Sequence, residues 1–571
     1  MNPLGKDNKY RKLSGMKKLL TALVCGAALF SAAAEKPLVR VGLMTDTHVT
    51  PRISSCSSLK KALQIFKANN VDLIVNSGDV ADTHKAQAYK NYYDTVRSVY
   101  PANKPKELFS FAWHDVINVG NWNNGWQKAW PLFKKGLGIE HEPYSKTVAG
   151  GYIFLTSPQN TDWKRYEKMI ADACRETPDK PVFLIDHVPA ANTTFNTGTW
   201  GNARTRRILN KYPQVVQISG HSHGSFRNEL QIWQGEFTVV NVGCTSQYWG
   251  GSLVGNAPER IRTDEAMLME IYKNKIVIRR FDLAKQIEYK KDSPWSFPLP
   301  FDPETAPYTQ KKRNNVPAPQ FAENSKVIAL PDKVPFNSMR LTFPEAKNGG
   351  EPYIYSIKML RKNKSGKWES FSTREIYAGF MKDPQKRKTV STGLSSGFFD
   401  SGRSYQVEIT PYNFFGKAGK PLKGTFTVPQ KVETELIFES KNPMKDCPFM
   451  TGLEGGRKIA VKNGFYQHPG GNARLEFPED VWKAPAKARF RFTVDMQMKQ
   501  FGKSSWTVVL RNPKPLENAN ARIATPQGDS GVQRYVIEFA KRKDFHKYYL
   551  LIREAGKGEI RFDYVKIERL K

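Results

Sequence analysis

The chain has 571 residues, of which 39% are hydrophobic and 12% are aromatic. That length exceeds a single ordinary core, so two to four domains are expected, and the composition excludes an intrinsically disordered chain. The formal net charge of +34 favours weak attraction to anionic polymers or surfaces, but no arginine-rich run marks a nucleic-acid-binding segment.

The N-terminal segment has the pattern of an export signal. After Met16, two lysines precede an apolar stretch, Leu19–Phe30, which the small residues Ser31–Ala34 follow. This order predicts a signal peptide within residues 1–34, of which 1–15 are an upstream extension, and Glu35 as the first mature residue. The apolar stretch is too short to cross a bilayer, so we expect an exported bacterial protein, periplasmic or extracellular or at the cell surface, with no membrane span.

Residues 35–290 are predicted to form a layered α/β domain, because apolar strands alternate with helical patterns from residue 38 to 285. Helical segments are expected at 57–70, 83–96 and 162–176, the last with Asp162 as its N-cap. A closing hairpin is expected at 265–282. The remaining strands are predicted at 39–45, 72–78, 107–113, 152–157, 182–187, 215–220 and 237–243.

The rest of the chain is predicted to be all-β. A proline-rich stretch at 291–321 is typical of an extended linker. Residues 322–429 carry short strands and turn signals, and the stretch GRSYQVEITPYN resembles a late strand of fibronectin type III domains, with Tyr405 matching the buried corner tyrosine. The end of residues 430–571 resembles the closing strands of galactose-binding-like jelly rolls, the architecture of many carbohydrate-binding modules. A structural sandwich without a ligand remains an equal alternative for both blocks.

Potential metal ligands follow several of the predicted strands. In open α/β sheets, sites form beyond the carboxyl ends of the strands, so we expect these side chains to converge. Carboxylates and imidazoles suit zinc, iron or manganese, and a carboxylate shared by two ions is typical of phosphoryl transfer. A purely structural role would bury several polar groups, each costly unless paired. The residues are Asp46, His48, Asp79, His114, Asp115, His187, His221 and His223.

The order of these motifs resembles the calcineurin-like metallophosphoesterase superfamily, which has DxH, GD, GNH followed by an acid, a lone His and GHxH. The resemblance covers residues 38–285 and implies a four-layer α/β sandwich. It implies hydrolysis of a phosphomonoester or phosphodiester by a metal-bound hydroxide, with His114 as general acid oriented by Asp115. It also implies two divalent ions: a first held by Asp46, His48 and His223, and a second held by His187 and His221, with Asp79 as the bridge.

One motif departs from the family pattern. Ala112-Trp113-His114 stands where the family has Gly-Asn-His. The indole of Trp113 only donates a hydrogen bond, so it cannot replace the asparagine ligand of the second metal. The second ion then binds weakly, gains a water or recruits a neighbour such as Asn118 or Asn121. We expect Trp113 to be a packing residue; the alternative is a stacking surface for an aromatic or sugar leaving group.

Three functions stay open. The first is an exported, metal-dependent phosphoesterase acting on a phosphate-ester substrate. We favour it because the six predicted ligands, His114 and Asp115 all match the family pattern. The second is a catalytically impaired scaffold that displays its C-terminal sandwiches for carbohydrate, protein or anionic-polymer binding. The third is a nuclease, because the positive net charge favours binding to the phosphates of nucleic acids. Specificity is expected in the loops 118–144 and 190–206, whose candidates for a cap or lid are Trp122, Trp126, Trp130 and Trp200.

The remaining histidines and cysteines carry no motif. His84 is expected to face solvent, and Asn241 and Gly243 to lie at the last strand end, either lining the site or forming a turn. The cysteines contain no Cys-x-x-Cys pair, which argues against a thiolate zinc site, and their pairing is not deducible. Oligomeric state is equally open. The residues without partner motifs are His141, His468 and His546, and the four mature cysteines are Cys56, Cys174, Cys244 and Cys447.

Overall fold

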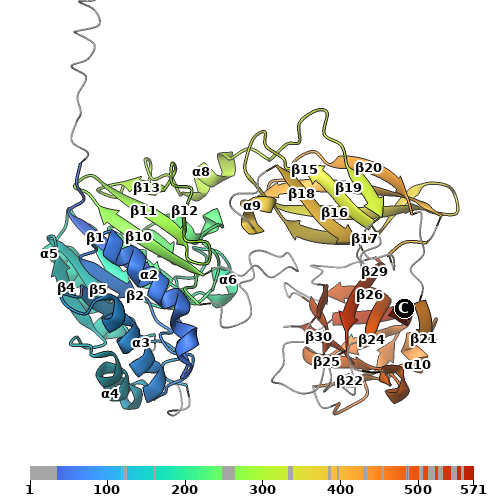
Figure 1. Ribbon diagram of the computed structural model, residues 1–571, viewed down its shortest axis with the longest axis horizontal. Coiled ribbons are helices and arrows are strands. Elements are labelled where there is room, and N and C mark those ends of the chain that lie inside the picture. The colour runs from blue at the N-terminus through green and yellow to red at the C-terminus, as the bar shows by residue number, and fades with distance from the viewer. Residues whose placement is uncertain are drawn as a thin grey trace, which may run out of the picture.

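The structure is a computed structural model that shows three bodies in chain order, one α/β and two all-β (Figure 1). The predicted signal peptide and His546 lie outside the described residues. The structure describes residues 35–571 except 118, 120–124, 160–161, 247–263, 332–338, 383–387, 395–397, 401, 429–433, 453–454, 484, 486–487, 501–505, 512–520, 525–530, 542–548, 555–557 and 571.

The first domain contains two β-sheets. In the first sheet, β1, β2 and β3 are parallel, and the remaining strands extend the sheet from β1 in antiparallel pairings. Its order is β12-β11-β10-β1-β2-β3, with β13 also on β11. The bounds are β1 (Val39–Met44), β2 (Leu73–Asn76), β3 (Lys106–Phe109), β10 (Glu265–Ile271), β11 (Lys275–Asp282), β12 (Ile287–Tyr289) and β13 (Trp295–Pro298).

The second sheet has a parallel centre of β5, β6, β7 and β9, with antiparallel strands at both edges. Its order is β4-β5-β6-β7-β9-β8. The bounds are β4 (Ser145–Ala149), β5 (Tyr152–Thr156), β6 (Val182–Ile185), β7 (Val215–Ser219), β8 (Ile232–Gln234) and β9 (Thr238–Asn241).

The two sheets pack face to face between two helical layers. Alternate residues of β1, such as Val41 and Leu43, share one apolar cluster with Phe183 and Ile218 of the second sheet. The opposite face of the first sheet packs against α2, α3 and α4, and that of the second against α5 and α7. This arrangement confirms the predicted four-layer sandwich. The helices are η1 (Ile53–Cys56), α2 (Ser57–Ala68), α3 (Ala86–Val99), α4 (Gly125–Leu137), α5 (Trp163–Glu176), α6 (Thr197–Trp200), α7 (Ala203–Leu209) and η2 (Glu229–Gln231).

The segment 291–321 differs from the predicted extended linker. Trp295–Pro298 forms β13 and adds to the first sheet, and α8 (Gln310–Asn315) follows it. Arg313 of α8 is buried and donates to the carbonyl of Ile232. The prolines suggested a free connection, but this segment carries aromatic and guanidinium side chains that pack on the first domain.

The second domain is a β-sandwich of a three-stranded and a four-stranded sheet, with orders β14-β15-β18 and β17-β16-β19-β20. Tyr405 is buried, as predicted, and its hydroxyl accepts a hydrogen bond from the backbone N–H of Asp400 at 2.7 Å. The elements are β14 (Ile328–Pro331), β15 (Met339–Pro344), β16 (Pro352–Lys362), β17 (Trp368–Tyr377), α9 (Gly379–Lys382), β18 (Thr389–Leu394), β19 (Ser404–Asn413) and β20 (Leu422–Thr427).

The third domain is a larger antiparallel sandwich. One sheet has the order β23-β24-β31-β26-β29 with β21 on β31, and the other has the order β22-β25-β30-β27-β28. One apolar cluster joins their facing sides. The elements are β21 (Thr434–Ser440), α10 (Pro443–Asp446), β22 (Phe449–Thr451), β23 (Val461–Lys462), β24 (Phe465–His468), β25 (Gly471–Glu476), η4 (Glu479–Trp482), β26 (Arg489–Gln500), β27 (Trp506–Arg511), β28 (Ala521–Ala524), β29 (Gln533–Ala540), β30 (Tyr549–Glu554) and β31 (Gly558–Leu570).

None of the helices in the described part of the chain has the length and apolar character that crossing a membrane requires. The four described cysteines are buried and unpaired with one another.

Candidate metal centre

The backbone turns sharply where the predicted ligands follow their strands. Five of the six predicted ligand residues have a left-handed backbone, with φ angles between +41° and +68°, although none is glycine. Such a conformation costs free energy and persists where surrounding contacts impose it, which is common at functional sites. These residues are Asp46, His48, Asp79, His221 and His223.

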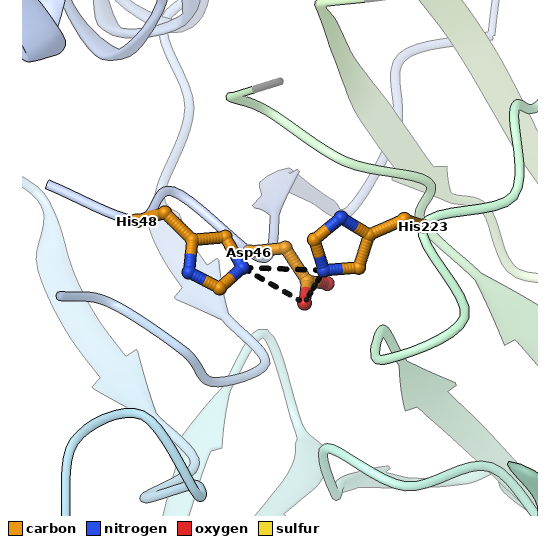
Figure 2. A group of neighbouring side chains, drawn as sticks. All are labelled: Asp46, His48 and His223. Atoms are coloured by element: carbon orange, nitrogen blue, oxygen red, sulfur yellow. Dashed lines mark hydrogen bonds and ion pairs between the residues drawn. The ribbon is translucent and has the colours of Figure 1, made fainter. Parts of the chain in front are cut away.

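Asp46, His48 and His223 form the first group (Figure 2). Nε2 of His223 lies 3.0 Å from Oδ1 of Asp46 and 3.2 Å from Nε2 of His48. That His48 nitrogen lies 3.7 Å from the same carboxylate oxygen. The other oxygen of Asp46 accepts from the Thr45 hydroxyl at 2.8 Å and from the His221 backbone N–H at 3.0 Å, so Oδ1 is directed to the group.

Asp79, His187 and His221 form the second group. Nε2 of His187 lies 3.2 Å from Oδ2 of Asp79, and Nδ1 of His187 lies 3.0 Å from the carbonyl oxygen of Ser77. Because a carbonyl can only accept, Nδ1 is the donor and Nε2 faces the carboxylate. Oδ1 of Asp46 lies 4.0 Å from Nε2 of His187, which places Asp46 between the two groups. The bridging role of Asp79 stays a prediction.

The donors of both groups fit divalent cations. In the described residues, Oδ1 of Asp46 and Nε2 of His187 are buried and make no hydrogen bond of normal geometry. Burial alone would raise the pKa of Asp46, but the charges of His223 and His187 outweigh it and lower the pKa well below its usual value. Burial alone would lower the pKa of His187, yet Asp79 and Asp46 raise it to about 9. The carboxylates therefore favour positive charge here, which a divalent ion would supply.

His114 lies beside the first group, with its ring centroid 4.7 Å from that of His48. Nδ1 of His114 lies 2.7 Å from the carbonyl oxygen of Asp82 and 3.8 Å from its carboxylate. The backbone N–H of His114 donates to Oδ1 of Asp79 at 2.9 Å. Asp82 therefore orients the ring of His114. We did not identify Asp82 from the sequence, although it follows Asp79 by three positions.

Asp115 has a different task from the predicted one. Its buried carboxylate accepts from the backbone N–H groups of Ala81, Val80 and Ala112 at 3.0, 3.3 and 3.4 Å. Burial, together with the charge of Asp79, raises the pKa of Asp115 well above its usual value. Asp115 thus ties the loop of His114 to the loop after β2, instead of contacting the imidazole as predicted.

The tryptophans near the site also differ from expectation. Trp113 is 39% exposed, which is more than a fully packed residue would be. Trp200 is 52% exposed, and its ring centroid lies 5.6 Å from that of His221. Trp130 of α4, by contrast, is buried in the apolar cluster between the helices and the first sheet. Trp126 is partly buried and packs against the same cluster. The proposed substitutes Asn118 and Asn121, and Trp122, lie outside the described residues.

Other residues have structural roles. His84 is only partly exposed, because its Nδ1 lies 2.8 Å from the Asp115 carbonyl oxygen and 2.9 Å from the Tyr89 hydroxyl, which corrects the solvent-facing prediction. The amide of Asn241 donates to the Gly220 carbonyl at 2.7 Å and so braces the turn before His221. Backbone N–H groups donate to the rings of His141 and His468.

Cys244 is a neighbour of the first group that the motif search overlooked. Its buried sulfur lies 3.3 Å from Nδ1 of His223 and therefore helps to turn Nε2 of that ring toward Asp46. Burial raises the pKa of the thiol. A cysteine just after the last strand of the sheet was the signal for it, but scattered cysteines carry no spacing rule that predicts such a contact.

The comparison with models of protein families agrees with this geometry. Residues 39–225 match the family model of calcineurin-like phosphoesterases. No curated protein matches the chain. Among solved structures, a predicted phosphoesterase from Streptococcus pneumoniae aligns with 46% of this chain and 97% of its own, at 12% identity and a TM-score of 0.22. The CBM22-1 xylan-binding domain from Paenibacillus barcinonensis Xyn10C aligns with 25% of this chain and 99% of its own, at 12% identity and a TM-score of 0.19.

The family match begins at the first residue of β1 and ends two residues after His223. It therefore contains every predicted ligand and all three groups of described side chains that could hold an ion, the third being His48, Asp82 and His114. Residues 39–225 are a calcineurin-like phosphoesterase domain, and two all-β domains follow it in the chain.

Proposed function

We propose that this protein hydrolyses phosphomonoesters or phosphodiesters with two divalent ions of zinc, iron or manganese. The proposal rests on one observation. Two groups of three side chains, which come from separate strand ends, lie next to each other, and Asp46 lies between them. Asp46, His48 and His223 would hold one ion, and Asp79, His187 and His221 the other. Bound there, such ions would neutralise charge on the phosphoryl oxygens and lower the pKa of bound water.

His114 is the proton donor in this proposal. In hydrolysis, a water oxygen bonds to phosphorus, the ester P–O bond breaks, and the departing alcohol oxygen needs a proton. Nδ1 of His114 is held by the Asp82 carbonyl at 2.7 Å, so Nε2 is the nitrogen that exchanges a proton with the substrate. The Asp82 carboxylate lies 3.8 Å from Nδ1 and therefore faces the same side of the ring as the carbonyl.

The second group has three protein ligands, because the side chain of Trp113 offers no lone pair to a metal. We therefore expect the second ion to bind more weakly than the first. Elemental analysis of the purified protein, followed by titration with Mn²⁺, tests this: one tightly held ion and a second weaker binding step are expected.

Turnover tests the whole proposal. Wild-type protein loaded with Mn²⁺ or Zn²⁺ is expected to hydrolyse p-nitrophenyl phosphate or bis-p-nitrophenyl phosphate, and Asp79→Ala is expected to lose that activity together with the second ion. Asp172→Ala is the matched control, since Asp172 is an exposed residue of α5. A protein with neither bound metal nor turnover would instead be the impaired scaffold, and strong salt-dependent nucleic-acid binding with strand cleavage would identify a nuclease.

The export and the roles of the later domains are further parts of the proposal. The order of charged, apolar and small residues in 16–34 supports cleavage before Glu35, which N-terminal sequencing of the secreted protein would check. The three-plus-four strand arrangement and the buried Tyr405 support a fibronectin type III-like second domain. The antiparallel sandwich of the third domain supports a jelly-roll module for carbohydrate or anionic polymer, which calorimetry of the full chain with such polymers would test.

A further inference from the structure

Two exposed tryptophans border the metal centre. Of the tryptophans whose burial the structure describes, only Trp113 and Trp200 are exposed. Trp113 precedes His114, whose backbone N–H contacts Asp79, and the ring of Trp200 contacts the ring of His221. Isolated apolar residues on a surface need no explanation, but aromatic rings placed beside convergent polar groups are typical of ligand sites.

Trp200 is the better placed of the two. Its ring meets that of His221 at 65° with 5.6 Å between the centroids, and 52% of the residue remains exposed. A phosphate bound at the second group would lie near His221, and a substituent on it would then approach the indole that contacts this ring. An aromatic ring stacked on another gains from dispersion and from the interaction of the two π systems.

The loop that carries Trp200 is fixed before any ligand binds. Gly201 packs so closely on the backbone of Ala191 that a Cβ there would lie 2.6 Å from the Ala191 Cα. The backbone N–H of Asn202 donates to the carbonyl of Pro189, two residues after His187, at 2.8 Å. Inside the loop, the buried Thr197 hydroxyl accepts from the Thr193 N–H at 2.9 Å and donates to the Thr194 carbonyl at 2.8 Å.

These contacts anchor Trp200 to the same segment that supplies a ligand of the second group. Little entropy is then lost when a ring binds against it, because the backbone of the loop is already ordered. A loop built only to close a surface would not need a large apolar side chain in water at its C-terminal end.

We propose that Trp200 is a specificity-determining residue that stacks on a planar aromatic ring in the alcohol part of the phosphate ester. This inference rests on the proposed phosphoesterase function. The ring is an aryl group or a nucleobase, and a small aliphatic ester lacks the favourable contact.

Binding of stable phosphonates tests the stacking without any turnover, because their C–P bond is not hydrolysed. Calorimetry of the Mn²⁺-loaded full chain is expected to show phenylphosphonate binding about tenfold more tightly than methylphosphonate, the size of one aromatic contact. Trp200→Ala should remove this preference, and Trp200→Phe should keep most of it. Trp368→Ala, on β17 of the second domain, is the matched tryptophan control and should leave the preference unchanged.

Turnover then separates this inference from the proposed function. With p-nitrophenyl phosphate, Trp200→Ala is expected to raise KM about tenfold with kcat little changed, while the kinetics with glycerol 1-phosphate stay within about twofold. Equal losses for both substrates, or no loss in binding and turnover, would overturn the stacking role while leaving the enzyme a phosphoesterase. If the protein shows no turnover but still binds phenylphosphonate more tightly than methylphosphonate, only the proposed hydrolytic function is contradicted.

Discussion

At the scale of single residues, the orientation of His114 depends on a carboxylic acid three positions after a predicted ligand. Asp82 reaches Nδ1 of His114 through its carbonyl and lies 3.9 Å from Nδ1 of His48 through its carboxylate. A general acid matters most when the leaving group is a poor one, because a basic alkoxide needs its proton as the bond breaks. The leaving group is therefore a probe of what Asp82 does.

Asp82→Asn is expected to lower kcat about tenfold for an alkyl phosphate, with a smaller loss for p-nitrophenyl phosphate, whose leaving group needs little protonation. The substitution retains the backbone carbonyl and removes only the carboxylate charge. Steady-state kinetics with glycerol 1-phosphate and p-nitrophenyl phosphate measure the two losses, and Asp94→Asn on the exposed side of α3 serves as the control. Equal losses for both esters would mean that Asp82 acts by holding His48 in place.

The convergence of the six predicted ligands could be foreseen from the sequence, because parallel strands place their carboxyl ends at one edge and each motif directly follows a strand. Asp115 and Asp82 could not be told apart in this way. Both are close to His114 in space, and only the left-handed turns after β2 decide which carboxylate meets backbone amides. The partial exposure of Trp113 could not be predicted either, because it depends on how the chain leaves β3.

At the scale of elements, the ligand loops are shaped by glycines that leave no room for a side chain. A Cβ on Gly220, at the end of β7, would overlap the Thr45 hydroxyl and Oδ2 of Asp46, which come from the loop after β1. The turn that leads into the GHxH motif is therefore packed directly against Asp46 of the first group. The sequence identified this glycine as part of a motif, but not its partner from another strand.

Gly220→Ala is expected to displace Asp46 and to weaken binding of the first ion, with a loss of about 1–3 kcal/mol in the free energy of unfolding from overpacking. Mn²⁺ calorimetry and urea denaturation measure the two effects. Gly531→Ala is the matched control, because its Cβ would have no atom within 4 Å. Unchanged metal affinity in a destabilised Gly220→Ala protein would show that the contact with Asp46 is only structural.

At the scale of the whole molecule, the second domain is attached to the loop that follows GHxH. Arg227, four residues after His223, is buried, donates to the carbonyl of Met381 at 2.6 Å and pairs with Asp282. An apolar cluster runs without a break from the first domain into the second. From the sequence we predicted separate domains joined by a linker. Neither a hydrogen bond between residues 154 positions apart, such as Arg227 and Met381, nor an apolar core shared by two domains has a local sequence signature. The second domain therefore packs directly on the first.

Glu229 is the centre of this junction. Its carboxylate accepts from Trp295 Nε1 at 2.6 Å and from Lys290 at 2.8 Å, and Lys290 also pairs with Glu351 of the second domain at 2.5 Å. Burial alone would raise the pKa of Glu229, but Arg280 and Lys290 lower it to about 2. Because the folded pKa lies below the unfolded value, this carboxylate stabilises the folded state above about pH 4.5 and loses that effect as pH falls toward 2.

Glu229→Gln is accordingly expected to lower the free energy of unfolding by about 2 kcal/mol at pH 7, and the difference from wild type should shrink as pH falls below 4.5. Urea denaturation from pH 7 to pH 3 measures this difference, with Glu304→Gln as an exposed control. Other carboxyl groups protonate alike in both proteins, so their effects cancel in the comparison. A difference that stays constant with pH would mean that Glu229 contributes through packing and hydrogen bonds that its amide also makes, and that its charge does not hold the two domains together.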